Sequence, residues 1–371
     1  MKMKRKTIAI DLSEEFDKIN SVNMFINNDY IFESHDTSNI DQFKKSKKKI
    51  FLLSNILCNH AAIYVNLLND VWYHANNLYI EKENNTNKMI PYLNREIFSR
   101  LKIGVIGYGT IGKSPGDIMT NELYISTRQP ETLDELKAQG VICMFDNVLI
   151  TKKCDIIFIC VLPDQFKFVR YDLYGNIKQN QIIYSFCSSH DLGFITKSLN
   201  TTNVIKACGE DLVSSIESFE TKLFFYKTLQ ELWQDKSFIN YSCPILKSNV
   251  SICYDKILES WIYSALNMCT LHGISKDNTC SILNNVFNRN NDIEKFDDSF
   301  FVSNKQGFNL QNNLKSVFQH FNLHLVQIKK SPLSVKLNNN SNILQNIEKI
   351  YFQIFDDYND LSIKQGEMKQ I

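Results

Sequence analysis

The residues with the most evident chemical role are three glycines at the spacing G-x-G-x-x-G, directly after a short apolar strand predicted over residues 103–106. They lie in the segment Gly107-Tyr108-Gly109-Thr110-Ile111-Gly112. The first glycine permits a tight turn, the second lets the backbone approach a pyrophosphate, and the third lets the following helix pack closely. The N–H groups at the start of that helix would point at the phosphates. A dinucleotide-binding fold also needs a second strand after this motif, and one is predicted at 123–127. The six residues are therefore predicted to form a dinucleotide site.

The same segment also satisfies a second phosphate-binding pattern, G-x-x-x-x-G-K-S, which continues through Lys113 and Ser114. That pattern is typical of loops that wrap ATP or GTP phosphates. Such an NTPase also needs an aspartate at a strand end for its magnesium ion. The nearest one, Asp164, comes only after Pro163. The dinucleotide interpretation is favoured, and a P-loop-type NTPase is the weaker alternative.

The end of the second strand bears on which dinucleotide fits. An adenosine ribose with a free 2′-hydroxyl is usually held by an acidic side chain about 20 residues after the glycines. Here the chain reads Ser126-Thr127-Arg128, with two hydroxyls and a guanidinium in place of an acid. These groups suit a 2′-phosphate through charge-assisted hydrogen bonds. The sequence predicts NADP(H) rather than NAD(H), the alternative being that Arg128 is only a solvated loop cation.

Composition narrows the classes of function. The chain has 371 residues, of which 44% are hydrophobic, enough for two or three domains with sizeable cores. Its formal net charge of +1 gives no general attraction to nucleic acid or to an anionic membrane. No apolar run reaches the roughly 18 residues that a membrane span needs. We expect a small-molecule substrate, with neither nucleic acid nor membrane as a partner.

Cysteines and histidines predict neither a disulfide framework nor a metal site. The ten cysteines include no C-x-x-C pair, and several lie in apolar segments, where cysteine acts as a small hydrophobe. The basic N-terminus lacks the apolar stretch of a secretory signal. Together these features predict a reducing compartment, the cytoplasm. His320 and His324, four residues apart, are interpreted as a surface helix pair rather than as metal ligands.

Six strands are predicted between residues 101 and 208. The unbroken apolar run of 155–161 is typical of a buried strand in a parallel sheet that is covered on both faces. The remaining strands are predicted at 103–106, 123–127, 141–145, 181–186 and 203–206, with helices at 130–139 and 165–174. The alternation predicts an α/β fold with a Rossmann-type doubly wound parallel sheet over 101–208.

Helical periodicity dominates the rest of the chain. Residues 1–100 are predicted to form an irregular and helical arm, with an apolar helix face from Leu53 to Trp72 and a linker at 81–88. Residues 209–371 are predicted to form an all-helical substrate or dimerisation domain. Its helices are expected at 219–233, 255–272, 276–288, 308–328 and 342–357. A polar interruption at 338–342 precedes the last helix, and the tail after Asp356 is predicted to fray.

Four segments resemble the pyrroline-5-carboxylate reductase superfamily, and most closely its divergent branch of NADP-dependent oxidoreductase domain-containing proteins. In chain order they are GVIGYGTIG, ISTRQPETLDELKAQGV, CDIIFICVLPDQ and IIYSFCSS. The resemblance implies a Rossmann domain followed by a helical domain that often dimerises, so a homodimer is an option. It also implies that Val161, Leu162 and Pro163 pass beside the nicotinamide. By the same resemblance, residues 126–128 would hold the 2′-phosphate.

The chain departs from that family where substrate would be bound. The family's R-x-M-P-N-type loop and S-G-S-G-P-A helix entry are replaced by residues 204–209 and 251–256, which argues against proline synthesis. If Gly273 ends the substrate helix as in the reductases, Ser260 falls near a substrate-binding hydroxyl; the alternative is a plain surface serine. His190, after the fifth predicted strand, is the other catalytic candidate, and its alternative is a neutral loop histidine.

The sequence thus predicts an NADPH-dependent oxidoreductase that acts on a small imine or carbonyl substrate. An iminium acceptor already carries the charge that hydride neutralises, so the protein needs to supply little acid or base chemistry. An alternative from a different class is a catalytically degenerate protein that binds NADP(H) as a sensor or scaffold. The altered substrate segments favour that alternative.

Overall fold

The structure is a computed structural model that describes residues 37–85, 101–109, 122–187, 189–207, 234–244, 253–288, 295–301, 316–339 and 341–368. Three predicted phosphate-binding residues, Thr110, Ile111 and Gly112, lie outside these ranges. The predicted helix at 219–233 also lies outside them, as do residues 1–36 of the segment up to about residue 45 that was predicted to be irregular. That prediction is wrong over residues 37–45, which are helical. The fold can therefore be compared with the sequence predictions over the strands, the long N-terminal helix and most of the C-terminal helices.

Six parallel strands form one sheet in the order β3-β2-β1-β4-β5-β6. They are β1 (Lys102–Ile106), β2 (Glu122–Ser126), β3 (Ile142–Met144), β4 (Ile156–Ile159), β5 (Ile182–Ser185) and β6 (Val204–Lys206). This confirms the predicted Rossmann-type doubly wound sheet, in which β1 and β4 lie side by side where the strand order reverses. β4 is shorter than the predicted strand 155–161, because Val161 and Leu162 turn the chain into the helix that begins at Pro163.

Short helices connect the strands. The predicted helix at 130–139 is divided into η2 (Pro130–Thr132) and α5 (Asp134–Ala138), and the predicted helix at 165–174 corresponds to α7 (Pro163–Leu173). Two further helices, α6 (Asn147–Lys153) and α8 (Leu192–Leu199), were not predicted. Each begins at an aspartate whose carboxylate accepts a hydrogen bond from a backbone N–H three residues on, over 3.0 Å at Asp146 and 2.8 Å at Asp191.

The two faces of the sheet are covered differently. The crossover face packs against α6, α7 and α8, and its buried side chains are those of Ile106, Tyr124, Ile157, Ile159, Ile183 and Val204. The opposite, helical face belongs to a core cluster that continues into the C-terminal half of the chain. Its side chains are those of Ile103, Val105, Leu123, Ile125, Ile156, Phe158, Ile182, Tyr184 and Ile205. Because strand side chains alternate between faces, every strand that contributes to both lists is buried on both sides.

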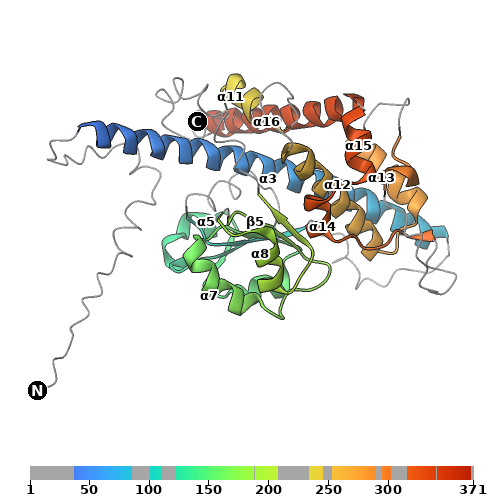
Figure 1. The fold of residues 1–371 in the computed structure, drawn as a ribbon, viewed down its shortest axis with the longest axis horizontal. Coiled ribbons are helices and arrows are strands. Elements are labelled where there is room, and N and C mark those ends of the chain that lie inside the picture. The colour runs from blue at the N-terminus through green and yellow to red at the C-terminus, as the bar shows by residue number, and fades with distance from the viewer. Residues whose placement is uncertain are drawn as a thin grey trace, which may run out of the picture.

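The long helix α3 (Thr37–Asn85) covers part of the helical face. It includes residues 81–85, where a linker was predicted, and almost every side chain between Leu52 and Leu68 is buried, on all sides of the helix. Tyr64 lies between the sheet and the helical half, with its ring centroid 5.4 Å from that of Tyr184 and 5.8 Å from that of Trp261. In Figure 1, α3 is the blue helix that lies above the sheet. It is therefore a central core helix.

The described part of the C-terminal half is helical, as predicted. Its elements are α11 (Lys236–Ser242), α12 (Cys253–Leu271), α13 (Lys276–Phe287), η5 (Asp298–Phe300), α14 (Leu323–Ile328), α15 (Pro332–Asn339) and α16 (Ser341–Met368). The helices predicted at 255–272 and 276–288 are confirmed as α12 and α13. The predicted fraying after Asp356 is wrong, because α16 continues to Met368. None of the helices in the described part of the chain is both long and apolar enough to cross a membrane.

The predicted helix at 308–328 is wrong over residues 317–322, which are not helical. The side-chain amide of Asn267 instead pairs with the backbone of Phe321, donating to its carbonyl over 2.8 Å and accepting from its N–H over 2.7 Å. Asn322 then caps α14 by accepting from the N–H of Leu325 over 3.1 Å. These tertiary and capping hydrogen bonds replace the intrahelical ones that a continuous helix would need.

Candidate functional site

The turn after β1 has the geometry expected of the first glycine in the motif. Gly107 adopts a φ of 90°, in the region that favours glycine, and its N–H donates to the carbonyl of Ser126 over 2.9 Å. A Cβ added to Gly107 would lie 2.7 Å from Cγ1 of Val161 and 3.0 Å from the carbonyl oxygen of Cys160. The absence of a side chain thus lets the turn close against the strand next to β1.

The residues that follow leave an open backbone edge. The half-buried ring of Tyr108 packs against the core of the helical face. An added Cβ at Gly109 would meet no atom of the described residues within 4 Å. Among the described residues, nothing therefore fills the space beside the Gly109 backbone at the carboxyl ends of the strands, where ligands bind in doubly wound sheets. This combination of a closed Gly107 and an open Gly109 fits a phosphate-bearing ligand.

The predicted 2′-phosphate residues lie together at the end of β2, but they differ in what they can offer. Ser126 is buried, and its hydroxyl donates to Oδ1 of Asn147 over 2.7 Å. Nδ2 of Asn147 in turn donates to the carboxylate of Asp172 over 2.9 Å. In this arrangement the Ser126 hydroxyl can accept a hydrogen bond but has no proton left for a phosphate. Donors toward a phosphate come from the half-buried Thr127 and the exposed Arg128.

The turn after β4 presents an apolar surface. Val161 is half-buried against Gly107, and the side chain of Leu162 is 47% exposed. The carbonyl of Leu162 accepts from the N–H groups of Gln165 and Phe166, over 2.9 and 3.1 Å, at the first turn of α7. Pro163 occupies the first helical position, where its missing N–H costs nothing. The turn therefore projects side chains, rather than free carbonyls, from the carboxyl edge of the sheet.

His190 lies at this edge, in contact with the same turn. Its ring Nε2 lies 3.0 Å from the carbonyl oxygen of Pro163, so Nε2 must be the donor, because a carbonyl only accepts. The thiol of Cys187, which the sequence analysis did not single out, donates to the carbonyl of Val161 over 3.4 Å. Burial raises the pKa of Cys187 to about 11, which keeps the thiol protonated. His190 and Cys187 thus both contact the predicted nicotinamide turn.

Ser260 is buried in α12 rather than on a surface. Its hydroxyl donates to the carbonyl of Lys256, one turn earlier in the same helix, over 2.7 Å. This hydrogen bond satisfies the serine locally, as is common for serines inside helices. His190 thus contacts the residues predicted to hold the coenzyme, whereas the hydroxyl of Ser260 is bonded within its own helix.

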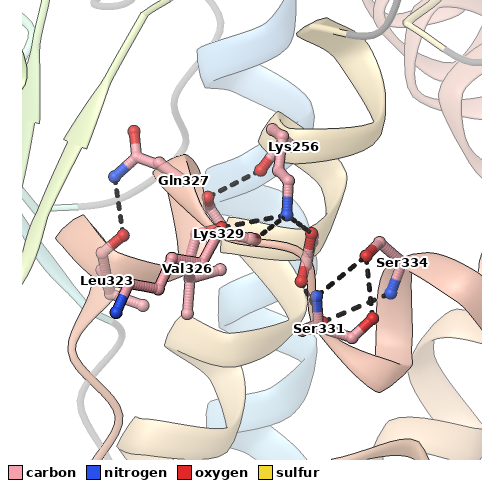
Figure 2. A network of polar contacts seen from close by, with 9 residues as sticks. Lys256, Leu323, Val326, Gln327, Lys329, Ser331 and Ser334 are labelled. Atoms are coloured by element: carbon pink, nitrogen blue, oxygen red, sulfur yellow. Dashed lines mark hydrogen bonds and ion pairs between the residues drawn. The ribbon is translucent and has the colours of Figure 1, made fainter.

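A polar network around Lys256 joins α12 to the junction of α14 and α15, as Figure 2 shows. The Lys256 ammonium donates to Glu259 over 2.6 Å, to the carbonyl of Val326 over 3.2 Å and to the carbonyl of Lys329. Glu259 is fully buried and also accepts from the hydroxyl of Ser331. The cation thus lies at the C-terminal end of α14, where the helix dipole favours positive charge. The i, i+3 spacing of Lys256 and Glu259 was the only signal of this network in the sequence.

Metal-ligating side chains do not gather in the described residues. No group of three or more histidines, cysteines, aspartates or glutamates there could hold a metal ion. His320 lies in the non-helical segment before α14, whereas His324 lies inside that helix. The predicted surface helix pair of these two histidines is therefore wrong, because Asn322 starts the helix between them.

Comparison with known proteins finds similarity to one protein family over most of the parallel sheet. Residues 102–188 match the protein family described as NADP oxidoreductase coenzyme F420-dependent. These residues are thus similar to NADP oxidoreductases, which confirms the predicted resemblance and agrees with the predicted NADP(H). The chain is also 26% identical over 287 residues to NADP-dependent oxidoreductase domain-containing protein 1 of Mus musculus, covering 73% of this chain and 76% of the mouse protein.

Solved structures that match this chain include 1-pyrroline-5-carboxylate reductase from Streptococcus pyogenes. It is 14% identical, with a TM-score of 0.24, and the match covers 69% of this chain and 98% of the reductase. A protein of Thermus thermophilus is also 14% identical with a TM-score of 0.24. That match covers 39% of this chain and spans 48% of the Thermus chain.

The family match and the strand order both favour the dinucleotide interpretation over the P-loop alternative. Lys113 and Ser114, on which that alternative depends, lie outside the described residues. Asp164, its candidate magnesium ligand, is exposed in the first turn of α7 rather than placed at the end of β4.

Proposed function

We propose that this protein is an NADP(H)-dependent oxidoreductase that transfers hydride between the coenzyme and a small imine or carbonyl substrate. The observation that carries the proposal is the pair of glycines at the end of β1, one closed against β4 and one open at the carboxyl edge. The match of residues 102–188 to the NADP oxidoreductases supports it. The likeness of the chain to an NADP-dependent mammalian relative supports the choice of NADP(H) over NAD(H).

The residues at the carboxyl ends of the strands each have a role in this proposal. The backbone of Gly107 and Gly109 would lie against the pyrophosphate, and Thr127 and Arg128 would hold the 2′-phosphate. The apolar turn at 161–163 would lie beside the nicotinamide, whose reduced form supplies the hydride. With an iminium acceptor, the protein mainly has to bind, orient and exclude water.

The proposal is tested by titrating purified protein with NADPH, NADH and ATP. We expect NADPH to bind at least tenfold more tightly than NADH, because only NADPH carries the 2′-phosphate to which Arg128 would make charge-assisted hydrogen bonds. Oxidation of NADPH is then followed spectroscopically with cyclic imines and small ketones. Tight ATP binding without NADPH binding would instead support the P-loop NTPase.

Arg128→Ala sharpens the test of coenzyme choice. The variant should lose about tenfold or more in NADPH affinity and little in NADH affinity, since a hydrogen bond to a charged group contributes about 1.5–3 kcal/mol. Arg170→Ala, which removes an arginine from α7 whose guanidinium lies over the Tyr171 ring, is the matched control and should change neither affinity. Equal losses of NADPH and NADH in Arg128→Ala would contradict the predicted phosphate contact.

A second candidate function is NADP(H) binding without turnover, as a sensor or scaffold. The position of Ser260 favours it, because the hydroxyl proposed to contact substrate is buried and bonded within its own helix. Tight NADPH binding with no oxidation by imines or ketones would support this candidate over the enzyme.

The compartment and the assembly are further parts of the proposal. Eight of the cysteines in the described residues are free thiols, which supports a reducing compartment such as the cytoplasm. We also propose that the protein associates as a homodimer through its helical half. Light scattering of the purified chain would test this, and a monomer at micromolar concentration would contradict it.

A further inference from the structure

The turn at 161–163 is fixed by hydrogen bonds to three consecutive carbonyl groups. Cys187 donates to the carbonyl of Val161, the first-turn amides of α7 donate to that of Leu162, and His190 donates to that of Pro163. Two of the three carbonyls accept from side chains of one segment, the loop between β5 and α8. The loop between β5 and α8 thus fixes the position of the turn at 161–163.

The His190 ring is itself fixed by aromatic packing. Its centroid lies 5.3 Å from that of Phe166 on α7 and 4.9 Å from that of Phe194 on α8. The backbone N–H of His190 also donates to the carbonyl of Cys187, over 3.3 Å, so the two side chains belong to one local turn. A donor that is held by two rings and by its own backbone loses little side-chain entropy when it makes its hydrogen bond.

The consequence is an apolar surface with fixed shape. With the three carbonyls engaged, the turn exposes the side chain of Leu162, flanked by Val161 and the Pro163 ring. Flat, uncharged rings bind to apolar walls that are already formed, because no group has to be ordered on binding. The dihydropyridine ring of reduced nicotinamide is such a ligand, whereas the adenosine half of the coenzyme is bound at the ends of β1 and β2.

We propose that Cys187 and His190 are positioning residues that hold residues 161–163 as a rigid apolar wall for the nicotinamide half of the coenzyme. This inference rests on the proposed function. His190 acts through the Pro163 carbonyl and Cys187 acts through the Val161 carbonyl, so neither needs to touch the reacting atoms. The role differs from the acid or base role that a histidine at this edge would otherwise suggest.

The experiment compares two ligands that share the adenosine half. NADPH carries the nicotinamide, whereas adenosine 2′,5′-bisphosphate carries the 2′-phosphate without it. The variants are His190→Phe, which keeps a ring but removes the donor, and Cys187→Ala, which removes the thiol. Each should weaken NADPH about fivefold, the usual effect of one neutral hydrogen bond, and leave adenosine 2′,5′-bisphosphate unchanged. Thermal unfolding of each variant checks that the fold is retained.

Conservative variants and a site control complete the design. His190→Gln and Cys187→Ser each keep a donor and should recover most of the NADPH affinity. Arg128→Ala should show the opposite pattern, because it should weaken both ligands. Unchanged NADPH binding in His190→Phe and Cys187→Ala, or equal weakening of both ligands, would overturn the inference while leaving the proposed function intact. Failure of the unmodified protein to bind either ligand would overturn the proposed function, and the inference with it.

Discussion

The two faces of the sheet are equally well buried, yet they are built from different parts of the chain. The crossover face is covered by α6, α7 and α8, which connect consecutive strands. The helical face is covered by α3, which precedes the first strand, and by helices that follow the last one. The crossover face is therefore covered by helices that connect neighbouring segments of the chain. The helical face brings together α3 and the C-terminal helices, which lie far apart in the sequence.

This difference affects cooperativity. The cluster on the helical face runs without a break from the strands through α3 into α12 and α16. The nucleotide-binding sheet and the helical half therefore share one core, although the sequence suggested separate segments at 1–100, 101–208 and 209–371. A shared core predicts that the sheet and the helical half unfold together. It also predicts slower folding than local connections alone would give, because distant segments must meet first.

The largest effect is expected for Trp261→Ala. Trp261 is fully buried in α12 and packs against Tyr64 of α3, so its removal should cost about 3–5 kcal/mol of unfolding free energy. Denaturant unfolding followed by circular dichroism should show one transition at lower midpoint. Hydrogen exchange should accelerate in both β5 and α12.

Phe166→Ala is the matched control on the crossover face, where Phe166 is also fully buried. Its cost should be comparable, but the faster exchange should centre on α7 and α8. Separate transitions for the sheet and the helical half in Trp261→Ala would contradict the shared core.

The second largest effect is a loss of folding stability at low pH, and it arises from a histidine on the helical face. His60 lies in α3, with its Nε2 2.9 Å from the carbonyl oxygen of Ser242, and burial lowers its pKa from 6.5 to about 4. Between these values the unfolded chain binds a proton that the folded chain excludes, so stability falls as pH is lowered from about 6.5 to about 4. The loss is on the order of 3 kcal/mol.

His60→Gln tests this pH dependence, because glutamine keeps a donor for Ser242 but does not titrate. Denaturant unfolding measured between pH 7 and pH 4 should show a shallower loss of stability in this variant than in the unmodified protein. Parallel curves for the two proteins would show that His60 is not the group responsible.

The structure of the crossover face was easier to predict from the sequence than that of the helical face. The strands were found because an apolar run is a property of a few neighbouring residues. The segment Ser126–Arg128 was likewise placed correctly at the carboxyl end of β2. Even α6 and α8, which were missed, carry a local signal in their capping residues Asp146 and Asp191.

The helical face could not be predicted in the same way. The pattern of α3 indicated one apolar stripe, whereas Asn59 and His60 on its other sides are also buried. Asn59 donates to Ser242 and to Tyr351, which are 183 and 292 residues away in sequence. Polar residues in a helix indicate a solvated face unless such distant partners are known. The engagement of Ser126 with Asn147 was missed for the same reason, since the partner lies on an unpredicted helix.

A smaller effect is expected at Gly104 on the crossover face. A Cβ there would lie 2.5 Å from Cγ2 of Ile150 and 3.0 Å from Sγ of Cys154, so α6 would have to move away from β1. Gly104→Ala should cost about 1–3 kcal/mol of unfolding free energy. The destabilisation by Gly104→Ala should be smaller in an Ile150→Ala background, because alanine lacks the Cγ2 methyl group that the new Cβ would meet.

Gly140 is the control for the backbone effect of that substitution. It has a φ of 91° and open space around it within the described residues, so Gly140→Ala is strained by conformation alone. It should show no coupling to Ile150→Ala. A double-mutant cycle that gave equal coupling for both glycines would mean that close packing of α6 on β1 is not the cause.

The smallest effect is expected at the β6 edge of the sheet, where a side chain of the C-terminal half bonds to the strand. Gln327 of α14 accepts from the N–H of Lys206 over 3.0 Å and donates to the carbonyl of Val204 over 2.7 Å, so its amide pairs with β6 as a neighbouring strand would. Gln327→Leu should cost about 1–2 kcal/mol, because two partly buried backbone groups lose their partners. Hydrogen exchange of the Lys206 amide should accelerate.

Gln327→Glu separates the two hydrogen bonds. Glutamate can still accept from Lys206 but cannot donate to Val204, so exchange at Lys206 should stay slow while stability falls by about half as much. If both variants left the Lys206 amide protected, the edge of β6 would not depend on α14. Near this edge, the C-terminal half would then be held by the hydrogen bond from the N–H of His324 to the carbonyl of Thr202, in addition to the core on the helical face.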